Sequence, residues 1–283
     1  MTHKSGMLLM LAAAACIGVQ AFFVKLAAEY TNAAEIAFLR FLASYLIVRV
    51  AMSAGWVTIE LVNWKGVLAR ALFGGAGNLL YFYAIASTRL SNAIVLLYTY
   101  PIFASLYDRW WQGAAFGLST LAALAASFIG IILIVHPNFE ALLPGDLLAL
   151  LSGMLVGGAI VSLRESRKTD SAWTIFHYFN ITGMALSLPL VMAHWGDGVV
   201  PPLASLPSLG GVVLFSMLGQ MGMTIAYRYI STTEGSAVSM LGAVVGSLLG
   251  LLFLGESATP GFLLGSLLVV FSGVYLTLRT ARA

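Results

Sequence analysis

"GMLLMLAAAACIG" (residues 6–18) and "GDLLALLSGMLVG" (residues 145–157) are two versions of one apolar segment, set 139 residues apart in the chain. A second pair follows in the same order, because "YAIASTRLSNAIV" (83–95) is similar to "YRYISTTEGSAVS" (227–239) at an offset of 144 residues. Two ordered matches with similar offsets indicate that the chain arose by internal duplication.

The whole chain has the composition of an integral membrane protein. Of its 283 residues 60% are hydrophobic and only 9% are charged, and the mean hydropathy is +0.95. A water-soluble domain would carry far more charge. Hydrophobic runs of about twenty residues, each long enough to cross a bilayer as a helix, recur along the sequence. The ten predicted transmembrane helices cover residues 6–28, 33–52, 66–88, 90–110, 115–136, 146–164, 171–193, 208–230, 233–254 and 260–279.

Each copy of the repeat contains five predicted helices, with residues 1–139 in the first copy and 140–283 in the second. Because five is an odd number, the two copies must insert with opposite orientations. Inverted repeats are typical of secondary transporters, in which a site near the middle of the membrane is exposed to each side in turn. The connections are short, so we expect the two repeats to form one transport domain with no soluble enzyme domain attached.

The distribution of basic residues predicts the orientation of the chain in the membrane. With the N-terminus inside, the Lys and Arg expected at the cytoplasmic face are Lys4, Arg49, Lys65, Arg70, Arg109, Arg164, Arg167, Lys168, Arg228, Arg279 and Arg282. Lys25 and Arg89 fall outside, and Arg40 lies within the second helix. This asymmetry predicts two cytoplasmic termini and a place in the plasma membrane, which in a bacterium is the inner membrane. It leaves no basic stripe for nucleic acid.

Several short motifs point to a known family. They are Arg40-Phe41 in the second helix, Pro101 in the fourth, Gly145-Asp146 opening the sixth and Leu254-Gly255-Glu256 closing the ninth. In these motifs and in its five-plus-five organisation, the chain resembles the EamA-type members of the drug/metabolite transporter (DMT) superfamily over essentially its whole length. Its aromatic content makes it most similar to the amino-acid and metabolite exporters, including the YddG-type exporters of aromatic amino acids. Gln112 departs from the family pattern, which usually has glutamate at the end of the fourth helix.

The fourth helix carries hydroxyl groups and a proline in the middle of a membrane passage, in "LYTYPIF" (97–103). Tyr98 and Pro101 are three residues apart and share a helix face, whereas Tyr100 is expected to point nearly opposite. The proline leaves the carbonyl of Leu97 without its helical partner, which predicts a kink beside a protein-lined cavity. The alternative is that these hydroxyls only join neighbouring helices.

Other polar residues inside the predicted helices are candidates for the same cavity, because polar side chains that face lipid are costly. The candidate substrate-binding residues are Tyr98, Asn78, Tyr81, His177, Trp173, Asn180, Gln20 and Gln220. Trp173, His177 and Asn180 follow one helical stripe. Gln20 and Gln220 could equally form hydrogen bonds between helices. A pocket with aromatic walls and amide, phenol and imidazole groups suits an amphipathic zwitterion or a planar metabolite.

Two further groups have structural interpretations. Arg40 is the only cation predicted well inside a span, and Glu35, one to two turns away, is its expected partner; binding of a substrate carboxylate is the alternative for Arg40. Gly242 and Gly246 belong to a stripe of small residues that favours close helix packing and could slide during transport, and Pro101 is the third candidate for a gating or structural role.

The sequence thus predicts a secondary transporter that exports small amphipathic metabolites, including aromatic amino acids, by alternating access through a central aromatic-lined cavity. The alternatives are a transporter of drugs, nucleotide-sugars or phosphorylated metabolites and, less favoured, a membrane receptor without transport. An enzyme is disfavoured because no nucleophile–base pair or metal motif such as HExxH is present and the histidines, His3, His136, His177 and His194, are scattered. No cofactor or metal is expected. The expected partners are a small-molecule substrate and the lipid bilayer, and a monomer is compatible with the sequence.

Overall fold

The long hydrophobic runs form helices, because a helix satisfies its backbone hydrogen bonds within one segment. The computed structural model describes residues 2–88, 90–113, 118–135, 143–193, 202–253 and 260–280. Its helices are α1 (His3–Ala27), α2 (Ala33–Ser53), α3 (Trp64–Ser87), α4 (Leu90–Leu97), α5 (Tyr100–Gln112), α6 (Leu118–Val135), α7 (Pro144–Ser166), α8 (Ala172–Ala193), α9 (Leu206–Ala226), α10 (Thr232–Ser239), α11 (Leu241–Phe253) and α12 (Pro260–Thr280). A short 3₁₀ turn, η1 (Leu203–Ser205), precedes α9. The motif Leu254-Gly255-Glu256 and the residues Arg89 and His136 lie outside the described residues.

These helices correspond to the ten predicted membrane passages, of which the fourth (α4 and α5) and the ninth (α10 and α11) are each broken into two. Within the described residues, six segments are individually long and apolar enough to cross a membrane, namely α1, α2, α7, α8, η1 with α9, and α10 with α11. The prediction of an all-helical integral membrane protein is therefore confirmed.

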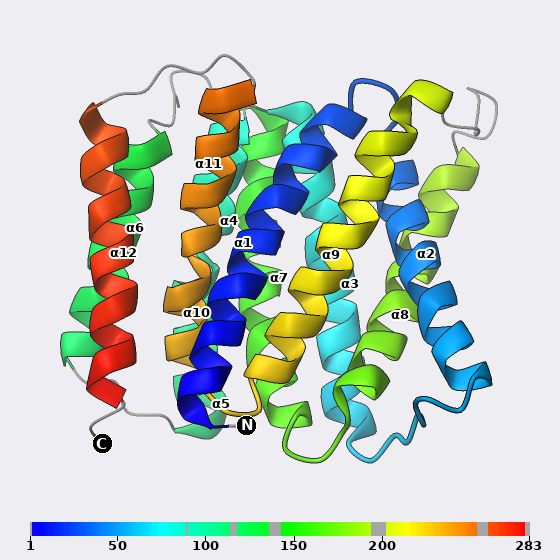
Figure 1. The fold of residues 1–283 in the computed structure, drawn as a ribbon, viewed down its shortest axis with the longest axis horizontal. Helices are drawn as coiled ribbons and strands as arrows, with labels where there is room; N and C mark the ends of the chain where they lie inside the picture. The colour runs from blue at the N-terminus through cyan, green and yellow to red at the C-terminus, as the bar shows by residue number, and fades with distance from the viewer. Residues whose placement is uncertain are drawn as a thin grey trace.

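The helices stand side by side in one bundle (Figure 1). At its centre α1 packs along α9 and α3 packs along α7. The pair α6 and α12 lies at one end of the bundle, and the pair α2 and α8 lies at the other. The start of α1 and the end of α12 are at the same edge of the bundle (Figure 1).

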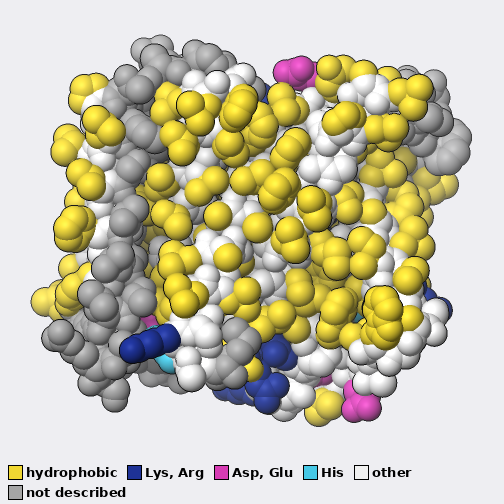
Figure 2. Space-filling view, viewed as in Figure 1, with side chains coloured by type: hydrophobic (Ala, Val, Ile, Leu, Met, Phe, Trp, Pro, Cys, Tyr) yellow, Lys and Arg dark blue, Asp and Glu magenta, His cyan; other side chains and the backbone are white. Residues whose placement is uncertain are grey.

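Apolar side chains cover the part of the surface that faces lipid, and basic side chains gather at one edge (Figure 2). Large residues such as Leu8, Leu121 and Phe271 are exposed in the isolated chain, as expected where hydrocarbon replaces water. The basic groups lie at the edge where α1 begins (Figure 2). At the end of α7, burial together with the positive charge of Arg228 lowers the pKa of the Arg167 guanidinium.

Local hydrogen bonds define where several helices begin, since the first amide groups of a helix have no partner within it. The Oδ1 atom of Asn32 accepts from the Glu35 amide at 2.9 Å, and Asn63 does the same for Gly66 at 3.0 Å. A reciprocal pair of bonds between Ser231 and Glu234 starts α10. These helix starts follow from short-range sequence signals.

The two broken passages have different causes. In the fourth passage α4 ends at Leu97 and α5 begins at Tyr100, with Pro101 in its first turn. Here the Thr99 hydroxyl donates to the Leu96 carbonyl at 2.6 Å, and the Thr99 amide donates to the same carbonyl, so Leu96 keeps hydrogen-bond donors where the helix is interrupted. The ninth passage breaks at Met240 without any proline, and no sequence signal predicted that break.

Small residues allow α1 and α7 to approach the broken passages closely. A Cβ atom at Gly18 would overlap the carbonyl oxygen of Gly242 and lie 3.0 Å from the amide nitrogen of Gly246. On the other side of the bundle, a Cβ atom at Gly157 would lie 2.8 Å from the amide nitrogen of Ala104 in α5. Gly242 and Gly246 therefore lie in a contact between backbones, as small residues do in membrane helix pairs.

The Gly18 contact yields a test of packing. Gly18→Ala should lower the midpoint of thermal unfolding, because its methyl group meets backbone atoms that cannot rotate away; we expect a loss of about 1–3 kcal/mol. Gly210→Ala is the matched control, since no atom lies within 4 Å of the added carbon. Unfolding of both variants in detergent would be followed by tryptophan fluorescence. Equal midpoints for the two variants would show that α1 and α11 do not touch in this way.

Candidate functional site

A central cavity lies beside the two breaks and is lined by α1, α3, α7 and α9 as well as by the broken passages. Its polar lining consists of Gln20, Asn78, Tyr81, Tyr98, Tyr100, Gln220 and Ser239. Ile17, Leu97, Val156, Ile160 and Met223 are the larger apolar residues of its wall. Phenol and amide groups on an apolar wall can bind an amphipathic solute through both hydrogen bonds and ring contacts.

The cavity brings together five of the eight residues that the sequence proposed for substrate binding: Gln20, Asn78, Tyr81, Tyr98 and Gln220. They come from α1, α3, α9 and the break between α4 and α5. The Oδ1 atom of Asn78 is buried and has no hydrogen-bond partner. An amide oxygen in this state is available to a ligand, because leaving it unpaired is costly.

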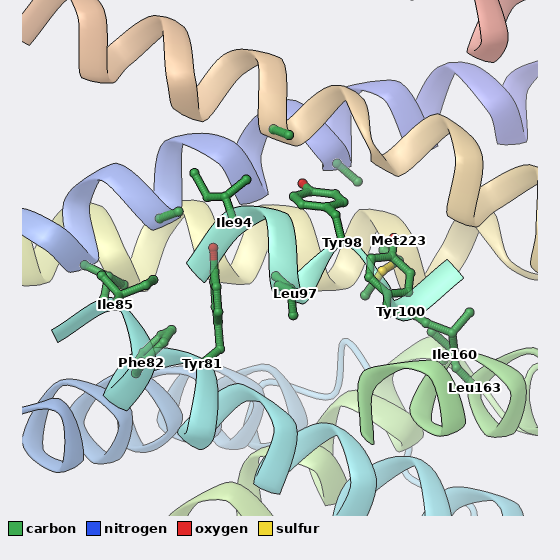
Figure 3. Packing of buried hydrophobic residues seen from close by; sticks show 14 of the residues in the cluster. Tyr81, Phe82, Ile85, Ile94, Leu97, Tyr98, Tyr100, Ile160, Leu163 and Met223 are labelled. Carbon is green, nitrogen blue, oxygen red and sulfur yellow. The ribbon is translucent and has the colours of Figure 1, made fainter. Parts of the chain in front are cut away.

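The position of Tyr100 differs from the prediction. The helical spacing placed it opposite Tyr98, but both tyrosines line the cavity, with ring centroids 6.0 Å apart (Figure 3). The reason is that the helix stops between them, so the rotation of a continuous helix does not apply. The Tyr100 hydroxyl is hydrogen-bonded to the Ser239 hydroxyl of α10. The proline at 101 was the available signal, since a helix commonly begins at the residue before or at a proline.

Three candidate residues, all in α8, lie outside this cavity. The ring of His177 lies 5.5 Å from the ring of Tyr45 and equally far from that of Tyr178. Asn180 donates from Nδ2 to the Phe176 carbonyl at 2.7 Å, and Trp173 is partly buried against the core. Trp173, His177 and Asn180 are not among the residues that line the central cavity.

The expected pairing of Arg40 with Glu35 is not observed either. Arg40 donates from Nε to the Ser216 hydroxyl of α9, and its guanidinium lies 4.3 Å from the ring centre of Phe41. Glu35 accepts a hydrogen bond from the Thr31 hydroxyl at the start of α2. A carboxylate in the first helical turn is stabilised there by the positive end of the helix and by local donors, so it does not reach along the helix to Arg40.

Arg70 is the most consequential residue that sequence reasoning misplaced. It was expected at the cytoplasmic face, yet it is only 3% exposed. Its Nη2 atom donates to Oε1 of Gln220 at 3.0 Å, and its guanidinium lies 4.5 Å from the ring centre of Phe179. Counting basic residues near helix ends predicts orientation but not depth. The signal that was available is the position of Arg70, almost two turns inside α3.

The structure holds the cavity in a collapsed state. Its volume is about 70 Å³, enough for a few water molecules, whereas sites for small metabolites measure about 300–1,000 Å³. A solute can therefore be bound only after the surrounding helices move apart. Among the described residues, no group of three or more His, Cys, Asp or Glu could hold a metal ion.

Polar contacts join the two halves of the bundle at both edges. At the edge where α1 begins, Nε2 of His3 lies 3.3 Å from Oε2 of Glu234 in α10. At the opposite edge, Oδ1 of Asp146 in α7 accepts from the Thr88 hydroxyl at 2.8 Å and from Nδ2 of Asn92 at 3.2 Å. Each contact joins the first helix of one half to the beginning of the broken passage of the other half, α1 to α10 and α7 to α4.

A helical membrane bundle with two broken passages around a small central cavity has the architecture of a membrane transporter. Residues 4–136 and 143–279 each match the EamA-like transporter family, and the chain belongs to that family. It is accordingly a secondary transporter of the drug/metabolite transporter superfamily and not an enzyme.

Known proteins of similar sequence are transporters. The chain is 28% identical to the pseudopaline exporter CntI of Pseudomonas aeruginosa, over 99% of this chain and 98% of the exporter. It is 25% identical to an uncharacterized transporter of Helicobacter pylori over 96% and 94% of the two chains. It is also 25% identical to a riboflavin transporter of Rhizobium johnstonii over 76% and 70%. A solved crystal structure with 15% identity covers 98% of both chains with a TM-score of 0.81, which shows the same fold.

The cavity lining can be tested without knowing the substrate. In a Cys16→Ala background, the variants Asn78→Cys, Tyr98→Cys and Tyr100→Cys should react with a small methanethiosulfonate reagent about tenfold faster than His177→Cys, because the reagent reaches the cavity when the surrounding helices move apart during transport. The reaction would be followed by mass spectrometry of protein in native-like vesicles. Fast reaction of Tyr98→Cys without any reaction of Tyr100→Cys would indicate a continuous helix and contradict the observed break.

Proposed function

We propose that the protein exports small amphipathic metabolites of the amino-acid class, aromatic ones included. The observation that carries this proposal is the central cavity, in which amides of Gln20, Asn78 and Gln220 lie with phenol groups on an apolar wall. Amides can pair with the ammonium and carboxylate groups of a zwitterion, and the apolar wall accommodates its side chain. The likeness to a pseudopaline exporter over nearly the full length supports export of a metabolite.

The two halves, residues 1–139 and 140–283, act in this proposal as inverted repeats of one transport domain. Equivalent contacts in the two halves support the assignment. In the first half Lys25 donates from Nζ to the Ile85 carbonyl at 3.2 Å, and in the second half its counterpart Arg164 donates from Nε to the Ile230 carbonyl at 3.1 Å. Lys25 and Arg164 each lie near the end of the first helix of their half. Each binds a carbonyl near the end of the third passage of the same half.

Alternating access then consists of opening one edge of the bundle at a time. Separation of His3 from Glu234 would open the edge at which α1 begins, and separation of Asp146 from Thr88 would open the other. The close contacts of α1 and α7 with the broken passages would be the surfaces that move, with Pro101, Gly242 and Gly246 at the points of motion. Rocking of one repeat against the other is how such folds expose a central site.

A second candidate function is transport of a planar heteroaromatic metabolite. It is favoured by the tyrosine rings at 81, 98 and 100 in the cavity wall and by the similarity to a riboflavin transporter. Aromatic rings bind a flat solute by offset stacking or edge contacts, which contribute about 0.5–1.5 kcal/mol per pair beyond the buried area.

Counterflow into proteoliposomes tests both candidates. Vesicles loaded with unlabelled solute should accumulate the same labelled amino acid transiently and with saturation, and flux should run down the solute gradient without an imposed pH difference. Exchange of labelled riboflavin but of no amino acid would replace the first proposal by the second. Absence of exchange for a full amino-acid panel and for riboflavin would contradict both, and accumulation that requires a pH gradient would show coupling to protons.

The orientation is proposed from the positive-inside rule, with both termini in the cytoplasm of a bacterial cell. Glu29 and Thr58 are exposed in the connections after α1 and after α2, at opposite edges of the bundle. In a Cys16→Ala background, a membrane-impermeant maleimide applied to intact spheroplasts should label the Glu29→Cys variant. The Thr58→Cys variant should be labelled only after permeabilisation. The reverse pattern would place the termini outside.

A further inference from the structure

Two buried arginines, Arg40 of α2 and Arg70 of α3, have their guanidinium groups near the same aromatic ring, that of Phe179 in α8. The guanidinium carbons of Arg40 and Arg70 lie 5.1 Å and 4.5 Å from the ring centre of Phe179. These distances place the two carbons within about 10 Å of each other, so the two positive charges repel across a medium of low dielectric constant. Arg40 is fully buried, and Arg70 is 3% exposed.

The two charges are not neutralised by the described part of the protein. The salt bridges found there join His3 to Glu234 and Lys168 to Glu165, and neither involves Arg40 or Arg70. Nη1 and Nη2 of Arg40 and Nε of Arg70 are buried without a hydrogen-bond partner. Since burying an unpaired cation is strongly unfavourable, this pair lowers the stability of the fold, and a functional use would explain its presence.

Gln220 connects the pair to the central cavity. Its side chain lines the cavity, and its Oε1 atom accepts the hydrogen bond from Arg70. Arg40 is held on the neighbouring part of α9 by Ser216, one turn before Gln220. A carboxylate that entered the widened cavity could therefore replace the Gln220 oxygen on Arg70 after a rotation of one side chain.

We infer that Arg40 and Arg70 bind the carboxylates of the transported metabolite, which therefore carries at least two of them. This inference rests on the proposed function and narrows its substrate class to anionic, amino-acid-like solutes. The two guanidinium groups have no carboxylate partner among the described residues, so a solute with two negative charges neutralises them best. Each can form paired, charge-assisted hydrogen bonds with one carboxylate.

The surroundings favour carboxylates over a phosphoryl group. The two guanidinium groups contact the hydroxyl of Ser216, the amide of Gln220 and the rings of Phe41 and Phe179. Phosphate sites commonly add a lysine or several backbone amide groups of a helix start to their arginines. Arg40 and Arg70 instead lie well inside α2 and α3, where the backbone amides are engaged in the helices.

The test compares two labelled solutes of nearly equal shape, L-glutamate and L-glutamine, in counterflow with the full-length protein in proteoliposomes. We expect the wild-type protein to exchange glutamate about tenfold faster than glutamine, the effect of one additional charge-assisted carboxylate contact. Equal rates, or faster exchange of glutamine, would overturn the inference. Stronger inhibition of exchange by glucose 6-phosphate than by glutamate would also overturn it, in favour of a phosphate site.

Variants of the pair add a second measurement. Arg40→Gln and Arg70→Gln should each bring the glutamate-to-glutamine ratio close to one. Arg49→Gln, which removes an exposed charge from the same helix as Arg40, should leave the ratio unchanged. Without solute, the two pair variants should unfold at the same temperature as the wild type or higher, since a buried unpaired charge is lost. A retained ratio in both variants, or their failure to fold, would assign the arginines a structural role and overturn the inference.

The outcomes separate this inference from the proposed function. If the wild-type protein exchanges neutral amino acids without preference for glutamate, transport of amino acids stands and the role of the arginine pair is rejected. If it exchanges neither the amino-acid panel nor glutamate, the proposed function fails and the inference fails with it.

Discussion

The cost of an unsatisfied polar group in hydrocarbon is the constraint on which this structure depends. It forces every membrane passage into a helix, because no water is present to bind free amide and carbonyl groups. It also decides where a passage can be interrupted. The breaks at Tyr98–Thr99 and at Met240 lie inside the bundle, where the hydroxyl of Thr99 and nearby backbone groups satisfy part of the interrupted ladder. A polar cavity thus forms at the breaks and not on the lipid-facing surface.

Close helix packing determines the shape of that cavity. Helices in lipid gain little from burying apolar surface against each other, so they associate where backbones can approach. Gly18 with Gly242, and Gly157 with α5, provide such contacts on the two sides of the site. Because these contacts contain few bulky side chains, the same helix surfaces can be in close contact in one state and separated in another. The collapsed cavity and the polar contacts at both edges are consistent with a closed state of this kind.

The fold tolerates wide changes in sequence. A solved structure that shares 15% of residues with this chain has the same fold over 98% of its length, and fold alone does not identify a substrate. In the function proposed here, the residues that face the cavity select the solute. The cavity is lined by three amides and three phenols, and two arginines lie one side chain further from it.

The sequence by itself determined the class of protein, the ten passages and their approximate limits, because hydrophobic length and composition respond directly to the bilayer. It also identified five residues of the cavity, since each is a polar group within a span and had to avoid lipid. Tertiary structure alone decided the rest. Tyr100 joined the cavity because its helix breaks, Trp173, His177 and Asn180 face another helix pair, and Arg70 is buried near Arg40. Helical periodicity shows which residues share a face, but which neighbour that face meets depends on how distant helices pack.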